Sequence, residues 1–160
     1  MDNNKAGDLS DNNNKDQVSR FNYTLNDLDR ISGMLFAAAL GVLFHQADLT
    51  EESIRLEQTG EGTLEENTAL NHAIAKELVD MSRMNLTAGF ISFYTTTERL
   101  KQIEAIFAKR HSPSAEERLT GREMVTMANV LTIIAFTLAS NGYELIADGI
   151  LKQQAETPPP

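Results

Sequence analysis

Residues 124–143 read MVTMANVLTIIAFTLASNGY and contain no charged side chain. A helix of this length would be about 30 Å long, which is enough to cross a bilayer. Polar side chains such as Asn129 and Asn141 interrupt the stretch, and polar groups in hydrocarbon need partners. No block of Lys or Arg flanks the stretch to set an orientation. The composition therefore predicts a buried core helix here, and a membrane is not expected to be a partner.

The rest of the chain also reads as helical. Hydroxyl side chains followed three residues later by an acid recur, and this spacing is typical of helix N-termini. Sustained alternation of apolar and polar residues, which would indicate strands, is absent from the sequence. The fold class is therefore predicted to be all-α, a bundle of four to six helices. The helix-start pairs are Thr24 with Asp27, Thr63 with Glu66, Ser114 with Glu117 and Thr120 with Glu123.

The predicted helices cover residues 24–46, 50–58, 64–110 and 121–154. A continuous helix over 64–110 would be about 70 Å long, longer than a compact domain of this size is wide. Its apolar stripe also changes phase near residues 85–89, so a break is expected there. Asn141-Gly142 is a second expected stop. The first stripe holds Leu70, Ile74, Leu78 and Met81, and the second holds Leu86, Phe90, Phe93, Thr97, Leu100 and Phe107.

The two ends of the chain differ from its middle. Residues 1–21 hold one Leu and one Val, and most of their other residues are Asn, Asp, Lys, Ser and Gly, which leaves too little apolar surface to offset the entropy of ordering them. They are predicted to be a disordered tail. Residues 22–156 are predicted to form a single helical domain, and Pro158 to Pro160 to lie in a short extended tail over 157–160.

Composition excludes several classes of protein. The 160 residues include 23 acids against 14 Lys and Arg, which gives a formal net charge of -9, and there is no Cys. A disulfide scaffold, a thiolate metal site and a cysteine nucleophile are therefore excluded. The acidic balance argues against direct nucleic-acid binding, which needs a surplus of basic residues. A secretory signal pattern is also missing from the first residues, so a cytoplasmic location is expected.

Motifs for catalysis or cofactor binding are not found. His45, His72 and His111 have neither a Glu three residues earlier nor a second His four residues away, so the helical di-iron and zinc patterns are missing. A nucleophile elbow and a phosphate-binding glycine loop are missing as well. The chain is therefore predicted not to be an enzyme, and neither a metal nor a cofactor is expected.

Gly33, Ala37 and Gly41 recur every four residues, so they share one face of a helix on which another backbone could approach closely. We call these three residues the small-residue face. The favoured interpretation is a tight helix crossing inside the bundle, because soluble cores also use small residues where helices cross. The alternative is that this face forms the seat of a homodimer.

Negative charge is concentrated between residues 48 and 66, where seven acids stand against one base, Arg55. One interpretation is a surface that steers a basic partner protein. The alternative is a solvated hairpin whose acids complement two helix N-termini. The candidate partner-facing residues, which we call the acidic segment, are Glu51, Glu52, Glu57, Glu61, Glu65 and Glu66.

By elimination, the sequence predicts a small, acidic, cytoplasmic protein-protein interaction module, such as an adaptor, a chaperone or a regulatory subunit. It would bind another protein through an apolar helix face, with a basic protein as one candidate partner and a second copy of the chain as another. Two alternatives stay open. One is a membrane-associated helical component of a transport or secretion assembly, and the other is an acidic inhibitor of a nucleic-acid enzyme.

Overall fold

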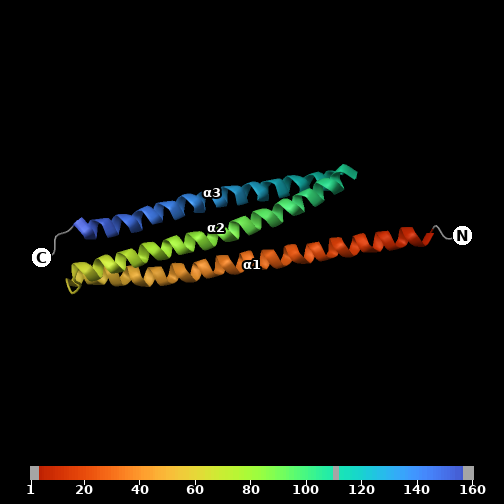
Figure 1. The fold of residues 1–160 in the computed structure, drawn as a ribbon. Coiled ribbons are helices and arrows are strands. Elements are labelled where there is room, and N and C mark those ends of the chain that lie inside the picture. The colour runs from red at the N-terminus through yellow and green to blue at the C-terminus, as the bar shows by residue number, and fades with distance from the viewer. Residues whose placement is uncertain (1–3, 110–111, 157–160) are drawn as a thin grey trace.

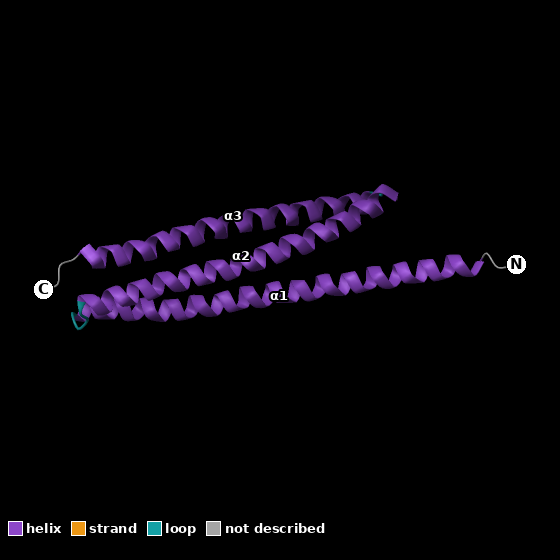
Figure 2. Ribbon diagram, in the orientation of Figure 1, coloured by secondary structure: helices purple, strands orange, loops and turns teal. Residues whose placement is uncertain are grey.

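A computed structural model describes residues 4–109 and 112–156 of the chain, and over these residues the fold is all-α. It consists of three long helices: α1 (Asn4–Thr59), α2 (Leu64–Lys109) and α3 (Pro113–Glu156). Figure 1 shows that consecutive helices run antiparallel, so that α1 and α3 point the same way, and Figure 2 shows a short loop between α1 and α2. The all-α prediction is confirmed, but the described residues form three helices and not the four to six expected.

The turn between α1 and α2 begins at Gly60 and ends at the predicted helix-start pair of Thr63 and Glu66. Gly60 has a φ of 67°, a left-handed conformation that glycine adopts without a steric penalty. Its N–H donates to the carbonyl of Leu56 at 3.0 Å. At the start of α2, the N–H of Glu66 donates to Thr63 Oγ1 at 3.2 Å, and the N–H of Thr63 donates to Glu66 Oε2 at 2.9 Å. Thr63 and Glu66 therefore form the predicted capping box.

The other three predicted helix-start pairs lie inside helices. Thr24 is within α1, where its hydroxyl donates to the carbonyl of Arg20, four residues earlier, at 3.1 Å. The start of α3 is capped by Ser112, whose Oγ accepts from the N–H of Ala115 at 3.2 Å. Pro113 takes the first helical position, where its missing N–H costs nothing. Ser114 and Thr120 follow within α3.

The capping box makes a testable prediction about acidity. Hydrogen bonds from the backbone and then the hydroxyl of Thr63 lower the pKa of Glu66. The carboxylate therefore stabilises the folded state above its ordinary pKa, and this stabilisation is lost as the pH falls through the lowered value. Thr63→Ala keeps the backbone donor and removes the hydroxyl, so we expect the pKa of Glu66 to rise partway, while Thr63→Ser leaves it unchanged. An NMR titration of the side-chain carboxyl carbon measures it, and equal values in all three proteins would contradict the assignment.

α2 lies between the other two helices and contacts both of them. Over the described part of the chain, α1 and α3 do not contact each other. The three helices therefore form an open layer, in contrast to a closed bundle in which each helix would touch the other two. This arrangement also explains why a helix of 46 residues is tolerated, since the molecule is elongated and no compact domain limits its length.

The phase change along α2 separates two faces of one continuous helix. Asn71, Ala88 and Thr95 contact α1. By the alternating spacing of three and four residues, the same face of α2 also carries Ile74, Leu78 and Met81. Gly89 and Thr96 contact α3. By the same spacing, this second face of α2 also carries Leu86, Phe93, Leu100 and Phe107. Each set is a heptad stripe for a different neighbour. The predicted break near residues 85–89 is therefore wrong.

Gly89 has a packing role in α2. A Cβ at this position would lie 3.3 Å from Cγ1 of Ile133 on α3, so the glycine allows the two helices to approach closely. The other expected breaks are also wrong. α1 continues through residues 46–50, where the hydroxyl of Thr50 donates to the carbonyl of Gln46 at 2.9 Å. α3 continues through Gly142.

The N-terminal tail also differs from its prediction. α1 begins at Asn4, so residues 4–21 are helical where a disordered tail was expected. Side chains from Asp16 to Thr24 are exposed, so packing does not explain this helix. The physical reason is cooperativity, because extending an existing helix avoids the cost of nucleating one. Figure 1 shows this end of α1 projecting past the turn between α2 and α3. The predicted extended tail over 157–160 lies outside the described residues.

The most deeply buried side chains between the helices are mainly small or polar. Only five apolar residues are classed as fully buried in the described part of the chain: Leu25, Ala39, Ala75, Val79 and Ala88. The buried polar residues are Ser32, Ser53, Ser82, Asn85, Thr95, Thr96 and Ser140. Small residues let helices approach, and each buried polar group then needs a partner across the seam.

Hydrogen bonds across the seam between α1 and α2 supply such partners. Ser32 Oγ donates to the carbonyl of Ala88 at 2.9 Å, and Ser92 Oγ lies 2.7 Å from Ser32 Oγ. Since Ser32 has a single hydroxyl hydrogen, Ser92 must be the donor in the second bond. Thr95 Oγ1 donates to Asp29 Oδ1 at 2.6 Å. These bonds fix the register of the first hairpin.

Candidate functional site

The main feature of the molecular surface is the amount of apolar side chain left on it. The chain exposes 11497 Å², whereas a compact monomer of 17.7 kDa would expose about 8,000 Å². The excess of about 3,500 Å² is too large for a few protruding side chains. Large exposed hydrophobic residues number nine on α1, four on α2 and nine on α3 within the described residues.

The outer face of α3 carries a regular apolar stripe. From residue 124 to residue 138 its members follow the alternating spacing of three and four residues that lets one helix pack along another, and the last member comes seven residues later, after Asn141. Each of them is at least half exposed, and the face lies roughly opposite, around the axis of α3, to Asn129 and Ile133, which contact α2. We call this stripe the α3 stripe; it consists of Met124, Met127, Leu131, Ile134, Leu138 and Leu145.

The α3 stripe was not recognised in the sequence, although its signal is present there. The stretch over 124–143 was interpreted as one apolar block and was expected to be a buried core helix. Within this chain that expectation is not met, because only 6% of the apolar window of α3 is buried. A helix that is apolar on two opposite faces, with only one neighbour, leaves one face without a covering.

The small-residue face on α1 is also uncovered. Ala37 is exposed, and no heavy atom lies within 4 Å of the position that a Cβ would take on Gly33 or Gly41. The favoured interpretation, a tight crossing inside the bundle, is therefore wrong. Large exposed side chains lie nearby on α1, including Met34 and Phe44, both 71% exposed. The seam with α2 instead uses Leu25, Ser32, Ala39 and Ser53, which are buried.

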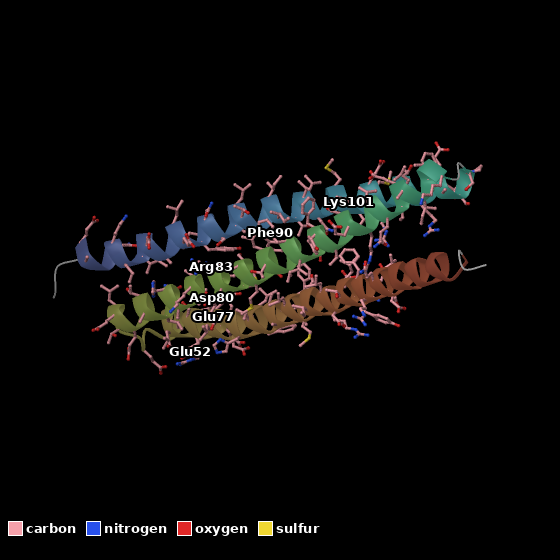
Figure 3. The ribbon with its side chains drawn as sticks, turned by 45° about the vertical axis from the view of Figure 1, so that its right-hand side comes forward. Glu52, Glu77, Asp80, Arg83, Phe90 and Lys101 are labelled. Atoms are coloured by element: carbon pink, nitrogen blue, oxygen red, sulfur yellow. The ribbon has the colours of Figure 1, made fainter. Side chains whose placement is uncertain are left out.

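The acidic segment lies at the hairpin tip between α1 and α2, and all six of its residues are exposed. Glu51, Glu52 and Glu57 are near the end of α1, Glu61 is in the turn, and Glu65 and Glu66 are in the first turn of α2. The structure therefore places them close together along the chain at one end of the first hairpin. Figure 3 labels Glu52 at this end of the layer.

Part of this charge is engaged within the chain. Arg55 forms hydrogen bonds with Glu52 and, at 2.7 Å, with Glu61. These bonds lower the pKa of Glu52 and raise the pKa of Arg55. Glu66 belongs to the capping box. Glu51, Glu57 and Glu65 have no hydrogen bond or ion pair within the described part of the chain, so they carry charge that a basic partner could meet.

The histidines and acids of the described part of the molecule do not gather into a metal site. No group of three or more His, Asp or Glu that could hold a metal ion is found there. His45 is paired through Nδ1 with Glu77, and the two residues join α1 to α2. His72 lies on α2, half-buried, and His111 lies outside the described residues.

Two helices are long and apolar enough to cross a membrane, as judged by length and composition alone. They are the part of α1 from Asp16 to Thr59 and the part of α3 from Pro113 to Gln153. Only 11% and 6% of their apolar windows are buried within the chain. A core helix of a soluble protein would pass the same length test, but it would be covered.

Comparison of the chain with protein-family models, with curated proteins and with solved structures finds no match. The uncovered faces of α1 and α3 and the acidic segment are therefore the features on which a functional argument rests.

Proposed function

We propose that this chain is a helical protein-protein interaction subunit that covers the outer faces of α1 and α3 with helices of other protein molecules. The observation that carries the proposal is the exposed area, which exceeds that of a compact monomer by about 3,500 Å². An obligate interface removes about 1,000–2,500 Å² from each partner. Part of this excess belongs to the projecting end of α1, and the nine large exposed apolar residues on each of α1 and α3 leave room for one interface on each of the two helices.

The distribution of polar and apolar side chains in the three-helix layer supports the same proposal. The most buried positions of its seams are mainly small or polar, while many long apolar side chains of α1 and α3 are exposed. Burying an exposed Leu or Met contributes about 1.5–3 kcal/mol, so a partner helix with a matching apolar face would gain considerable free energy. The acidic segment at the hairpin tip would speed encounter with a basic partner, in a manner weakened by salt.

The second candidate function is a membrane-associated component, and the low burial of the two apolar windows favours it. In a bilayer, large apolar side chains would face lipid and small residues would form the seams. Both candidate functions therefore use the exposed apolar faces of α1 and α3. They differ in whether protein helices or lipid cover these faces.

The register of the helices argues against a bilayer around all three. Thr95 bonds Asp29 on α1, and its neighbour Thr96 accepts a hydrogen bond from Asn129 on α3. Asp29 and Asn129 therefore lie at the same level of the layer. The uncharged stretch of α3 extends on both sides of this level, whereas that of α1 begins only at residue 31.

This offset between the uncharged stretches of α1 and α3 affects an ion pair on the surface of α1. Asp27 and Arg30 are paired at 3.1 Å and have side chains 66% and 80% exposed. A bilayer that covered residues 124–143 of α3 would bring this exposed pair into hydrocarbon, where charged groups are costly. We therefore place the interaction subunit ahead of the membrane component.

Fractionation of cells that express the full chain tests the choice between the two candidates. We expect the protein in the soluble fraction after a high-salt wash, and we expect the purified protein to stay in solution without detergent at a mass above that of a monomer. A detergent requirement, with recovery in the membrane pellet, would favour the membrane component. A soluble monomer that binds no protein would contradict the proposal.

A further inference from the structure

The α3 stripe limits what can cover it. Its six members occupy positions spaced alternately by three and four residues over three heptads, with Asn141 at the one position between Leu138 and Leu145 that is not apolar. The helix that carries them is continuous from Pro113 to Glu156 and nearly straight (Figure 1). This spacing accepts another helix lying nearly parallel or antiparallel to α3. An extended peptide, whose side chains alternate with a period of two, would not match it.

A row of small residues flanks the α3 stripe at intervals of seven. Gly121, Gly142 and Gly149 have no heavy atom within 4 Å of the position that a Cβ would take, and Ala128 and Ala135 are exposed. This row lets a second helix come close along one side of the stripe. The row is centred on Ala135, with two members on each side of it at equal spacing.

We propose that α3 pairs with α3 of a second copy of this chain, in antiparallel orientation about a two-fold axis near Ala135. This inference rests on the proposed function and names its partner. The axis would place Ala135 beside Ala135 of the second copy and Ala128 opposite Gly142, so the small rows face each other. The large residues also meet, Ile134 beside Leu138 and Met127 beside Leu145. A self-complementary patch is what a two-fold interface requires.

Charge distinguishes the antiparallel orientation from the parallel one. In a parallel pair of identical helices, each seam residue meets its own counterpart, so Asp148, which continues the spacing of the α3 stripe, would face Asp148. Like charges in a seam are unfavourable. In the antiparallel pair Asp148 lies beside Met124, and the helix C-terminus approaches the helix N-terminus, where the two dipoles attract.

The exposed area is consistent with this dimer. A stable homodimer interface removes about 1,000–2,500 Å² from each copy, which is within the excess of about 3,500 Å² that the chain exposes. The dimer would cover α3 and leave the outer face of α1 and the acidic segment free. A second copy on α3 therefore accounts for one uncovered face and leaves the other for a different protein.

Light scattering of the purified full chain tests the partner. We expect a mass of twice 17.7 kDa for the wild type and of one chain for Leu131→Glu/Leu138→Glu. The matched control is Leu40→Glu/Phe44→Glu on the outer face of α1, where both side chains are also more than half exposed; it should remain dimeric. Circular dichroism should show unchanged helix content in both variants. A wild type that is monomeric over the micromolar range would overturn the dimer.

Cysteine cross-linking tests the orientation, because the chain has no cysteine of its own. Under mild oxidation, Ala135→Cys should form a disulfide-linked dimer and Met124→Cys should not, since position 124 meets itself only in a parallel pair. The reverse result would overturn the antiparallel arrangement.

The two proposals fail in different ways. A wild type that is monomeric, but binds a protein from its own cells through α3 and loses it in Leu131→Glu/Leu138→Glu, would overturn the second copy and leave the interaction subunit standing. A wild type that is monomeric and binds nothing would overturn both. Recovery only with membranes would also overturn both.

Discussion

Replacing Leu25 by alanine is expected to lower the free energy of unfolding by about 2–5 kcal/mol. Leu25 is fully buried at 0% exposure and is the largest of the fully buried side chains. Its removal leaves a cavity at the end of the seam between α1 and α2, where few other apolar residues are buried. Because the buried apolar core is so small, this one side chain supplies a large share of the stability of the first hairpin.

The matched control for Leu25 is Leu40 on the same helix. Leu40 is 56% exposed, so Leu40→Ala should change the free energy of unfolding by no more than about 0.5 kcal/mol. Urea denaturation at one fixed protein concentration measures both variants, since a dimer would make the midpoint depend on concentration. Equal losses for the two leucines would show that the seam between α1 and α2 does not form as described.

Replacing Ala88 by leucine should destabilise the protein through overpacking, by about 1–3 kcal/mol. Ala88 has 0% exposure, and its carbonyl accepts the hydrogen bond from Ser32 at 2.9 Å. A larger side chain would push α1 away from α2 and stretch that bond. We expect a lower midpoint of thermal unfolding and faster exchange of amide protons near the seam.

Ala105 provides the control for this second change. It lies on the same helix and is exposed, so Ala105→Leu introduces the same side chain without crowding a seam. The helix propensities of Ala and Leu differ little, and the control should therefore unfold close to the wild type. Destabilisation of both variants by the same amount would attribute the effect to the leucine itself and not to the seam.

Local signals in the sequence were sufficient to predict the helical class and one of the helix ends in detail. Thr63 and Glu66 form the capping box that their spacing indicated, because a capping box depends on residues three positions apart and on nothing else. α3 starts at Pro113, eight residues before the predicted start at residue 121, because Ser112 caps it and proline suits the first helical position. Thr24 shows the limit of such signals, because the same pattern inside a continuous helix is satisfied by the preceding turn.

The number of helices was not predictable in this way. The phase change near Gly89 is real, but its cause is that α2 has two neighbours, and a sequence does not show how many neighbours a helix has. The length argument failed for the same reason, since it assumed a compact domain. Once α1 and α3 lie on opposite sides of α2 and do not touch, in the part of the chain that the structure describes, a helix of 46 residues is no longer too long.

Of the candidate surfaces, one was also predictable from the sequence and two were decided by the packing of the helices. The acidic segment is local in sequence, so its position at one hairpin tip was predictable. Whether the small-residue face and residues 124–143 are buried or exposed depends on whether another helix of the chain packs on them. Their apolar composition is compatible with a core, a membrane or a partner protein.

The sequence by itself determined the helical class, the hairpin turn at Gly60 to Thr63 and the concentration of negative charge beside that turn, because each depends on neighbours a few residues away. The tertiary structure decided that α2 has two seams, that the most buried positions in them are mainly small or polar, and that apolar faces of α1 and α3 are left outside. Covering an apolar face requires a second helix in contact, and only the arrangement of all three helices shows which faces have one.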